Sequence, residues 1–240
     1  MEKVLSDAEK FIKKWFNDTV DLFNSEVKSD KPVDHLCITS LTVSITYVKA
    51  IIILLSNGIR MPVKALLRVI FELGAKLAWC LQCPDESTDS DELVEEKIRQ
   101  WSKSSVKERV KILNGLENFW PWEAIQELKT RREGFEKLLK NLEDVKELPK
   151  FKQLVGQLPG DGVLELYTRC YSKFNDAVHL DISSLGDRVK EDERKLFVGF
   201  DSEEPVEDLV HYCVLIERII LFLVRSNYNW DTKELMKDKI

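Results

Sequence analysis

The chain has 240 residues, 44% hydrophobic and 32% charged, so it is too apolar to be disordered and long enough to bury a sizeable core. Its nine glycines and seven prolines fall mostly between periodic segments, which favours long helices over many short strands. A formal net charge of −6 argues against a protein that coats nucleic acid through a general positive field, and restricts any such contact to a local basic groove.

The first predicted helix is amphipathic and spans residues 7–27. Apolar side chains recur there at three- to five-residue intervals, and Ser6 and Asp7 are candidates for its N-cap. A second helix can be capped by Asp34 and runs to about Leu55. The sequence Ser56-Asn57-Gly58 that follows is typical of a left-handed helix end.

A third helix is predicted over residues 60–81 and is apolar on nearly every side. Because only a short turn separates it from the second helix, the two should form an antiparallel hairpin at the heart of the fold. Residues 36–55 approach the length that spans a membrane, with Lys49 as their only charge. Their many Ser and Thr residues favour a buried central helix over a membrane span.

The middle of the chain, residues 84–157, is dense in Lys, Arg and Glu. It predicts helices over residues 91–104, 106–118 and 121–144. Trp101, Phe119, Trp120 and Trp122 give this region an apolar edge. We therefore expect one domain, residues 1–240, in which residues 84–157 form a charged helical excursion packed on the core.

The C-terminal third predicts a helix over residues 163–180, a polar loop of about 20 residues, and a last core helix from Glu204-Pro205 to about Arg225. Glu217 and Arg218 interrupt the otherwise apolar run of that helix. The fold class that these elements predict is all-α, a helical bundle around the central hairpin with an outer layer of charged helices.

Five cysteines, with no export signal at the N-terminus, fit reduced thiols of a cytoplasmic protein that serve as packing residues. Cys80-Leu-Gln-Cys83 has the spacing of half a zinc site, but no second close Cys or His pair accompanies it. The sequence also lacks a Gly-rich phosphate loop, a nucleophile elbow and the H-E-x-x-H zinc motif. We expect no metal and no cofactor.

Two polar patterns could carry chemistry. Arg68 and Glu72 are four residues apart and therefore share one face of the third helix. Tyr171, Asn175 and His179 are spaced four and four, and form a polar stripe on the helix predicted over residues 163–180. Histidine is suited to proton transfer near neutral pH, although a histidine at a helix end is often a cap or a satisfied core group. Arg68 and Glu72 can likewise simply neutralise each other within the bundle.

The sequences IRMPVKALLRVIFELGAKLAW and YSKFNDAVH resemble a bacterial family of unknown function, whose members carry an R-x3-E helix and a later helix of the form Y-R-x-L-S-x-x-V-H. Arg68, Glu72, Tyr171 and His179 match this pattern. Ser172 and Asn175 stand where the pattern has Arg and Ser, so the stripe is only partly kept. The resemblance covers residues 35–83 and 163–225 and leaves out the charged middle.

That family is in turn similar to the HEPN helical superfamily. Many HEPN proteins are metal-independent ribonucleases of defence and toxin systems that act as dimers through an R-x4-6-H motif. The resemblance implies His179 as the base towards a ribose 2′-hydroxyl, with Arg169 or Lys173 facing the phosphate. Arg169 lies ten residues before His179 and about 80° away around a helix, and lysine cannot fork onto a phosphate, so the motif departs from the family pattern.

Three functions remain open from the sequence. A HEPN-like ribonuclease predicts that Arg68, Glu72, Tyr171 and His179 converge on one cavity, and that the protein contacts RNA as a homodimer. An interaction or regulatory protein predicts that the same residues only hold the bundle together. A small-molecule sensor would use Arg68 to hold an anionic ligand beside the apolar hairpin.

Overall fold

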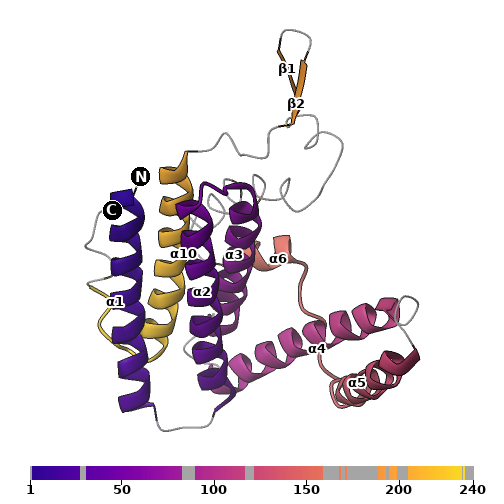
Figure 1. Ribbon diagram of the computed structural model, residues 1–240. Helices are drawn as coiled ribbons and strands as arrows, with labels where there is room; N and C mark the ends of the chain where they lie inside the picture. Colours follow the sequence, from indigo (N-terminus) through magenta and orange to yellow (C-terminus); the bar gives the residue numbers. More distant parts are fainter. Residues whose placement is uncertain are drawn as a thin grey trace. The chain divides into compact units, whose positions relative to one another are not determined.

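The computed structural model describes residues 2–27, 31–82, 90–116, 122–158, 168, 171, 189–192, 195–198, 205–233 and 235. Helices dominate these residues, and the predicted all-α class is confirmed (Figure 1). The elements are α1 (Glu2–Glu26), α2 (Pro32–Ser56), α3 (Met61–Leu81), α4 (Ser90–Leu116), α5 (Trp122–Lys140), α6 (Phe151–Gly156), β1 (Val189–Asp192), β2 (Lys195–Val198) and α10 (Val206–Asn227).

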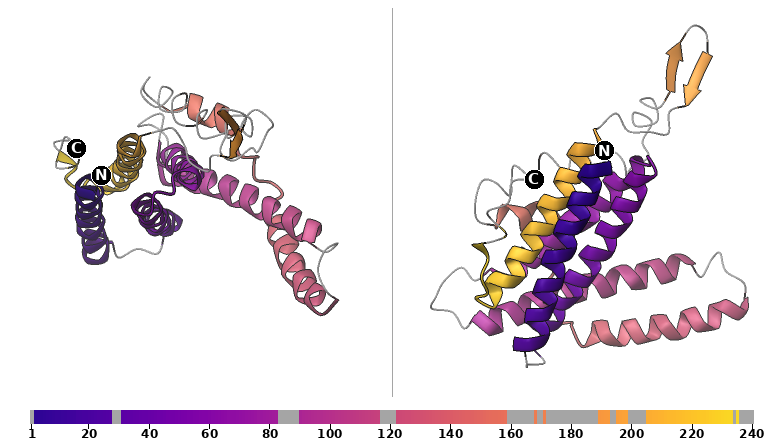
Figure 2. Two further views of the ribbon diagram at one scale, coloured as in Figure 1. Left: turned by 45° about the horizontal axis from the view of Figure 1, so that its top comes forward. Right: turned by 60° about the vertical axis from the view of Figure 1, so that its left-hand side comes forward.

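Four long helices form a bundle, seen nearly end-on in the left view of Figure 2. Helix α2 packs against α1, α3 and α10, and α10 packs against α1, α2 and α3. The predicted hairpin of α2 and α3 is present, but α10 shares the centre with α2 because both helices bury residues towards three neighbours. Gly74 of α3 permits a close approach, since a Cβ atom there would lie 3.3 Å from the side chain of Ile220.

The turn between α2 and α3 ends the first of these helices as predicted. Gly58 adopts a positive φ of 74°, which costs glycine little. Its N–H donates to the carbonyl of Leu55 at 3.0 Å, and the N–H of Ile59 donates to the carbonyl of Leu54 at 2.9 Å. This pair of hydrogen bonds is a Schellman motif, which satisfies carbonyls that the helix leaves without partners.

Both N-terminal helices begin earlier than predicted. Helix α1 starts at Glu2, so Ser6 and Asp7 lie inside it rather than at its cap, because buried Leu5 extends the apolar stripe towards the N-terminus. Helix α2 starts at Pro32, and Asp34 lies in its first turn. The Oδ2 atom of Asp34 accepts a hydrogen bond from the N–H of Lys31 at 3.2 Å, which satisfies a donor at the start of the helix.

Helix α2 is long and apolar enough to cross a membrane, by length and composition, and is the one described helix of which this is true. In the structure, 39% of its most apolar 18-residue stretch is buried. Its exposed positions carry mostly polar side chains, with Ile53 as the large apolar exception. The exposed polar residues are His35, Thr39, Thr42, Thr46, Lys49 and Ser56. A bilayer would meet this polar face, and the expectation of no membrane insertion stays a prediction.

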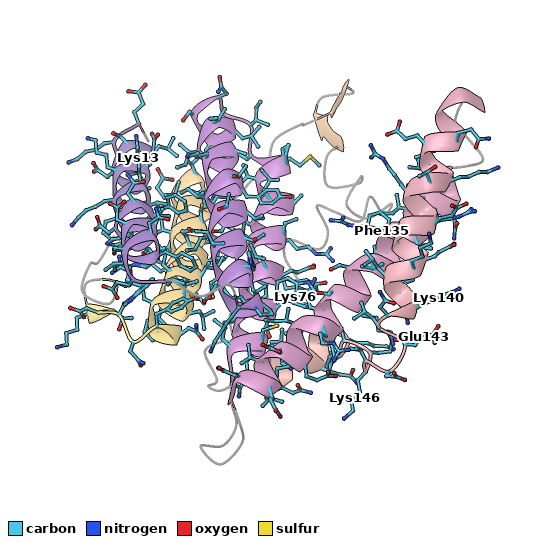
Figure 3. All side chains as sticks on the ribbon, turned by 90° about the horizontal axis from the view of Figure 1, so that it is seen from below. Lys13, Lys76, Phe135, Lys140, Glu143 and Lys146 are labelled. Carbon is cyan, nitrogen blue, oxygen red and sulfur yellow. The ribbon has the colours of Figure 1, made fainter. Side chains whose placement is uncertain are left out.

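The chain divides into two compact units, residues 1–81 with 154–240 and residues 82–153. The second unit contains the paired helices α4 and α5. Phe135 of α5 faces α4, where the guanidinium carbon of Arg109 lies 5.4 Å from its ring centroid (Figure 3). The docking of this charged region on the core stays a prediction.

Helix α4 is one continuous helix where two were predicted, over residues 91–104 and 106–118. The predicted break fell at Ser104-Ser105, and serine disfavours a helix interior only weakly, whereas no Gly or Pro interrupts the segment there.

A second difference lies in the predicted polar loop after residue 180. It contains an antiparallel pair of strands in which Val189 lies opposite Val198 and Asp192 opposite Lys195. The helix predicted over residues 163–180 lies outside the described residues except for Thr168 and Tyr171.

Candidate functional site

The centre of the candidate site is the ion pair of Arg68 and Glu72 on α3. The Nε atom of Arg68 donates to Oε1 of Glu72 at 3.0 Å, as their four-residue spacing predicts. The side chains are 16% and 27% exposed, so the pair is partly buried and still reachable from solvent. A pair in such a setting is stronger than a fully exposed one, because less water and salt screen it.

Tyr171 joins this pair from a segment about a hundred residues away. An Nη2 proton of Arg68 is donated to the phenolic oxygen of Tyr171 at 2.9 Å. The guanidinium carbon also lies 4.7 Å from the centroid of the tyrosine ring, within range of a cation–π interaction. The ring centroid of Phe71, which is also on α3, lies 6.5 Å from the ring centroid of Tyr171. Arg68 therefore connects α3 to the segment that carries the second predicted motif.

Lys76, which is labelled in Figure 3, lies one helical turn beyond Glu72 on α3. Its Nζ atom lies 3.9 Å from Oε2 of Glu72, so the carboxylate sits between two cations. Among the described residues, the cluster holds two cationic side chains and one carboxylate.

The structure thus brings together three of the five predicted site residues, Arg68, Glu72 and Tyr171. The other two, Asn175 and His179, lie outside the described residues. Arg169, Ser172 and Lys173 of the same predicted helix lie outside them as well. The convergence of His179 on this cluster stays a prediction, as do the catalytic roles of all five residues.

Sequence reasoning did not identify a fully buried polar contact, between Ser44 of α2 and Glu217 of α10. The hydroxyl of Ser44 donates to Oε1 of Glu217 at 3.1 Å, and both residues are fully buried. Burial raises the pKa of Glu217 to about 8, although the hydrogen bond from Ser44 lowers it. The signal in the sequence was a glutamate within the apolar run of the last helix.

The described cysteines are buried thiols: Cys37, Cys80 and Cys213. Burial raises the pKa of Cys37 to about 12 and that of Cys213 further, which makes both poor nucleophiles and supports their predicted role in packing. Across the described segments, no group of three or more His, Cys, Asp or Glu side chains is arranged to hold a metal ion. The expectation of a metal-independent protein stays a prediction.

A comparison with models of protein families identifies the family of this chain. The model of DUF5677, a family of unknown function, matches residues 34–196, which is more than half of the sequence. The chain belongs to the DUF5677 family. The predicted membership of a helical family of unknown function is thereby confirmed. Comparisons with curated proteins and with solved structures found no match.

The DUF5677 match also corrects the extent of the resemblance seen in the sequence. It runs through the charged residues 84–157, which the resemblance had left out, and it ends before α10. Charged surface helices vary easily in sequence because few packing constraints act on them, so a short motif cannot reveal them as part of a family. Arg68, Glu72 and Tyr171 all lie within the matched part of this DUF5677 protein.

Proposed function

We propose that this DUF5677 protein is a HEPN-like, metal-independent ribonuclease of a defence or toxin-type system, acting as a cytoplasmic homodimer. The observation that supports it best is the hydrogen bond from Arg68 to Tyr171. It links the R-x3-E helix to the first residue of the second motif, as expected if the two motifs serve one site.

In this proposal His179 removes the proton from a ribose 2′-hydroxyl, whose oxygen then attacks the adjacent phosphorus. The bond from phosphorus to the 5′-oxygen breaks, the leaving oxygen takes up a proton, and a 2′,3′-cyclic phosphate forms. Arg169 or Lys173 stabilises the developing charge on the phosphate. Arg68, Glu72 and Tyr171 are positioning residues that hold the motif segment, and Asn175 orients the substrate beside the histidine.

A second candidate function is that of a non-catalytic interaction or regulatory protein. The observation that favours it is that at least two of the three guanidinium nitrogens of Arg68 already bond to protein groups, which among the described residues are Glu72 and Tyr171. In this case the cluster would be a structural link between α3 and the segment at residue 171, and the charged second unit would bind the partner.

RNA cleavage by the full-length protein without added metal, and in the presence of a chelator, separates the two candidates. We expect wild type to cleave and His179→Ala to lose cleavage while its circular dichroism is unchanged. His211→Ala is the matched control, because His211 is an exposed histidine on α10 and should keep full activity. Cleavage by none of these proteins, across structured and unstructured RNAs, would reject the ribonuclease and favour the interaction protein.

A further inference from the structure

A pocket of about 650 Å³ opens in the bundle unit, where α1 meets the end of α10 and the turn that follows it. Figure 1 shows these two helices side by side, and they pack directly on each other. The volume is within the range of pockets that hold small molecules. Side chains of both charges and one large aromatic ring line it: Asp18, Asp21, Glu26, Arg225, Trp230 and Asp231.

Arg225 is a buried cation that has no counter-ion among the described residues. It is 5% exposed, and within that part of the chain it bonds to neutral oxygens. Its Nε donates to the hydroxyl of Thr19 at 2.9 Å and its Nη1 to the carbonyl of Asp231 at 3.1 Å. Its Nη2 has no hydrogen-bond partner in the described part of the chain, and the side chain lines the pocket. A charge removed from water in this way is stabilised by an anion placed against it.

The carboxylates of the pocket do not provide that anion. Asp18 and Asp21 lie three residues apart on one face of α1, and neither makes an ion pair or hydrogen bond with another described residue. Glu26 accepts a hydrogen bond from the indole N–H of Trp230 at 2.6 Å, and Asp231 accepts one from the main-chain N–H of Lys233 at 2.8 Å. The pocket is therefore lined by four carboxylates and one guanidinium and has a net negative charge. None of these carboxylates forms an ion pair with the guanidinium of Arg225.

Trp230 is held rigidly in the wall of the pocket. Its main-chain N–H donates to the carbonyl of Arg225 at 2.9 Å in a second Schellman motif, in which Asn229 adopts a φ of 56°. Its ring stacks on Tyr228 with centroids 4.8 Å apart, and Phe23 packs against it edge-on at 6.3 Å. An indole fixed in this way, beside carboxylates, offers an apolar surface and a cation–π contact to an organic cation.

We infer that this pocket binds a basic α-amino acid. The carboxylate of the ligand pairs with Nη2 of Arg225 on the pocket floor, and its two cationic groups meet Asp18, Asp21 and the other carboxylates. The aliphatic chain lies along Trp230. The acidic lining would repel a ligand that carries only negative charge, and a diamine would leave Arg225 without an anion. The site therefore selects a ligand that carries both a carboxylate and cationic groups. This site is separate from the cluster at Arg68 and does not depend on the proposed ribonuclease activity.

The test is calorimetric titration of the full-length protein with L-lysine, L-arginine and cadaverine, the last being lysine without its carboxylate. Wild type should bind the amino acids saturably and cadaverine about tenfold more weakly, since one charge-assisted hydrogen bond is lost. Asp18→Asn and Asp21→Asn should each weaken L-lysine binding about tenfold. Asp7→Asn, an exposed change on α1 outside the pocket, alters the net charge equally and should have no effect.

Arg225→Gln provides the more specific readout, after thermal unfolding shows that it is folded. It should lose the preference for L-lysine over cadaverine, which a general loss of stability would not change. Three results would overturn the inference: no saturable binding of either amino acid to wild type, equal binding of L-lysine and cadaverine, or undiminished binding by both aspartate variants.

Discussion

Ser44 and Glu217 are 173 residues apart in sequence, yet their side-chain oxygens lie 3.1 Å apart at the contact of α2 and α10. The Ser44 hydroxyl also lies 3.0 Å from the carbonyl of Leu41, and Oε2 of Glu217 has no partner in the described part of the chain. One hydroxyl proton cannot fully serve two acceptors. A protonated Glu217 that donates to Ser44 would free that proton for Leu41, in agreement with the raised pKa of the carboxyl.

The contribution of Glu217 to the stability of the protein should therefore fall as the pH rises. The pKa of Glu217 is about 8 in the folded protein against 4.5 for an unperturbed glutamate, so between these values the folded state keeps a proton that the unfolded state has released. The contribution of Glu217 to stability is fully present below about pH 4.5 and is lost as the pH rises towards 8. The expected loss is on the order of 5 kcal/mol, to be measured by urea unfolding at several pH values.

Glu217→Gln tests this origin, because glutamine keeps the size and a hydrogen-bonding group but does not ionise. The free energy of unfolding of the variant should lack the pH dependence that the Glu217 carboxyl causes in wild type. The variant should also be more stable than wild type near pH 8. Glu207→Gln, an exposed change on the same helix, should retain the wild-type dependence. If the free energy of unfolding falls equally steeply with pH in wild type and in Glu217→Gln, the carboxyl does not titrate in this range.

Thr19 is expected to be a sensitive position in the bundle although it is small. Its hydroxyl donates to the carbonyl of Trp15 at 2.8 Å and accepts from the buried guanidinium of Arg225 at 2.9 Å. Thr19→Val keeps the shape but removes the acceptor, and should lower the free energy of unfolding by about 2 kcal/mol. Thr19→Ser retains the hydroxyl and should cost clearly less. A valine variant as stable as the serine variant would contradict this role.

Local interactions account for most of what the sequence predicted correctly. Gly58 could be placed because a glycine after a long apolar helix signals a left-handed end whatever the rest of the chain does. The contact of Arg68 with Glu72 follows from helical spacing alone. The predicted break at Ser104-Ser105 was wrong because the preference of serine for caps is too small to end a helix that its neighbours favour.

The remaining contacts depend on how whole helices are rotated against each other. Ser44 meets Glu217, and Thr19 meets Arg225, only because α2 and α1 turn those faces towards α10, and the spacing within one helix carries no information on this. The pocket at Trp230 was missed for the same reason. Its residues come from two helices and a turn, and the sequence of each segment alone does not show that their side chains meet.

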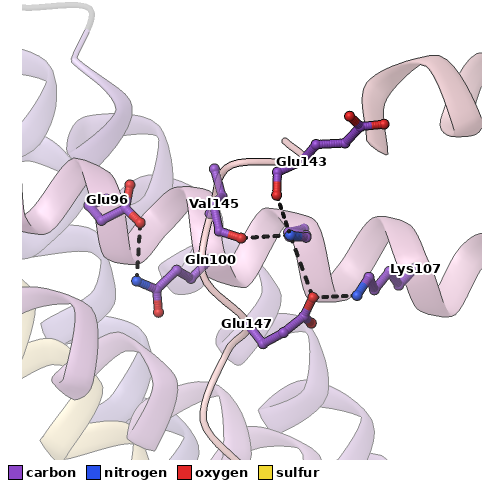
Figure 4. A network of polar contacts seen from close by, with 7 residues as sticks. Glu96, Gln100, Lys107, Glu143, Val145 and Glu147 are labelled. Carbon is purple, nitrogen blue, oxygen red and sulfur yellow. Dashed lines mark hydrogen bonds and ion pairs between the residues drawn. The ribbon is translucent and has the colours of Figure 1, made fainter. Parts of the chain in front are cut away.

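Lys103 should stabilise the second unit more than any exposed lysine of α4. It is buried, and its Nζ donates to the carbonyls of Glu143 at 3.2 Å and Val145 at 2.6 Å in the turns that follow α5 (Figure 4). Lys103→Met would leave both carbonyls without this donor, at a cost of about 2 kcal/mol. The amides of residues 141–145 should then exchange their hydrogens faster.

Lys107→Met is the matched control on the same helix. Lys107 pairs with Glu147 at the surface (Figure 4), where the hydrogen bond from the lysine lowers the pKa of the carboxylate. Water and salt screen such a pair, so its loss should change stability by less than about 1 kcal/mol. Equal exchange rates for the two variants would mean that Lys103 does not hold the turn.

The bond between Arg68 and Tyr171 predicts energetic coupling between α3 and the motif segment. Tyr171→Phe removes the acceptor of the Arg68 proton but keeps the ring, and should cost about 1 kcal/mol. Arg68→Met should cost more, because Glu72 then loses the closer of its two cationic partners. In a double-mutant cycle the two changes should couple by about 1 kcal/mol, measured by urea unfolding of the four proteins.

Tyr212→Phe, a change on α10, is the control for loss of a tyrosine hydroxyl and should not couple to Arg68→Met. Additive effects of Tyr171→Phe and Arg68→Met would show that the contact contributes nothing to holding the two motifs together.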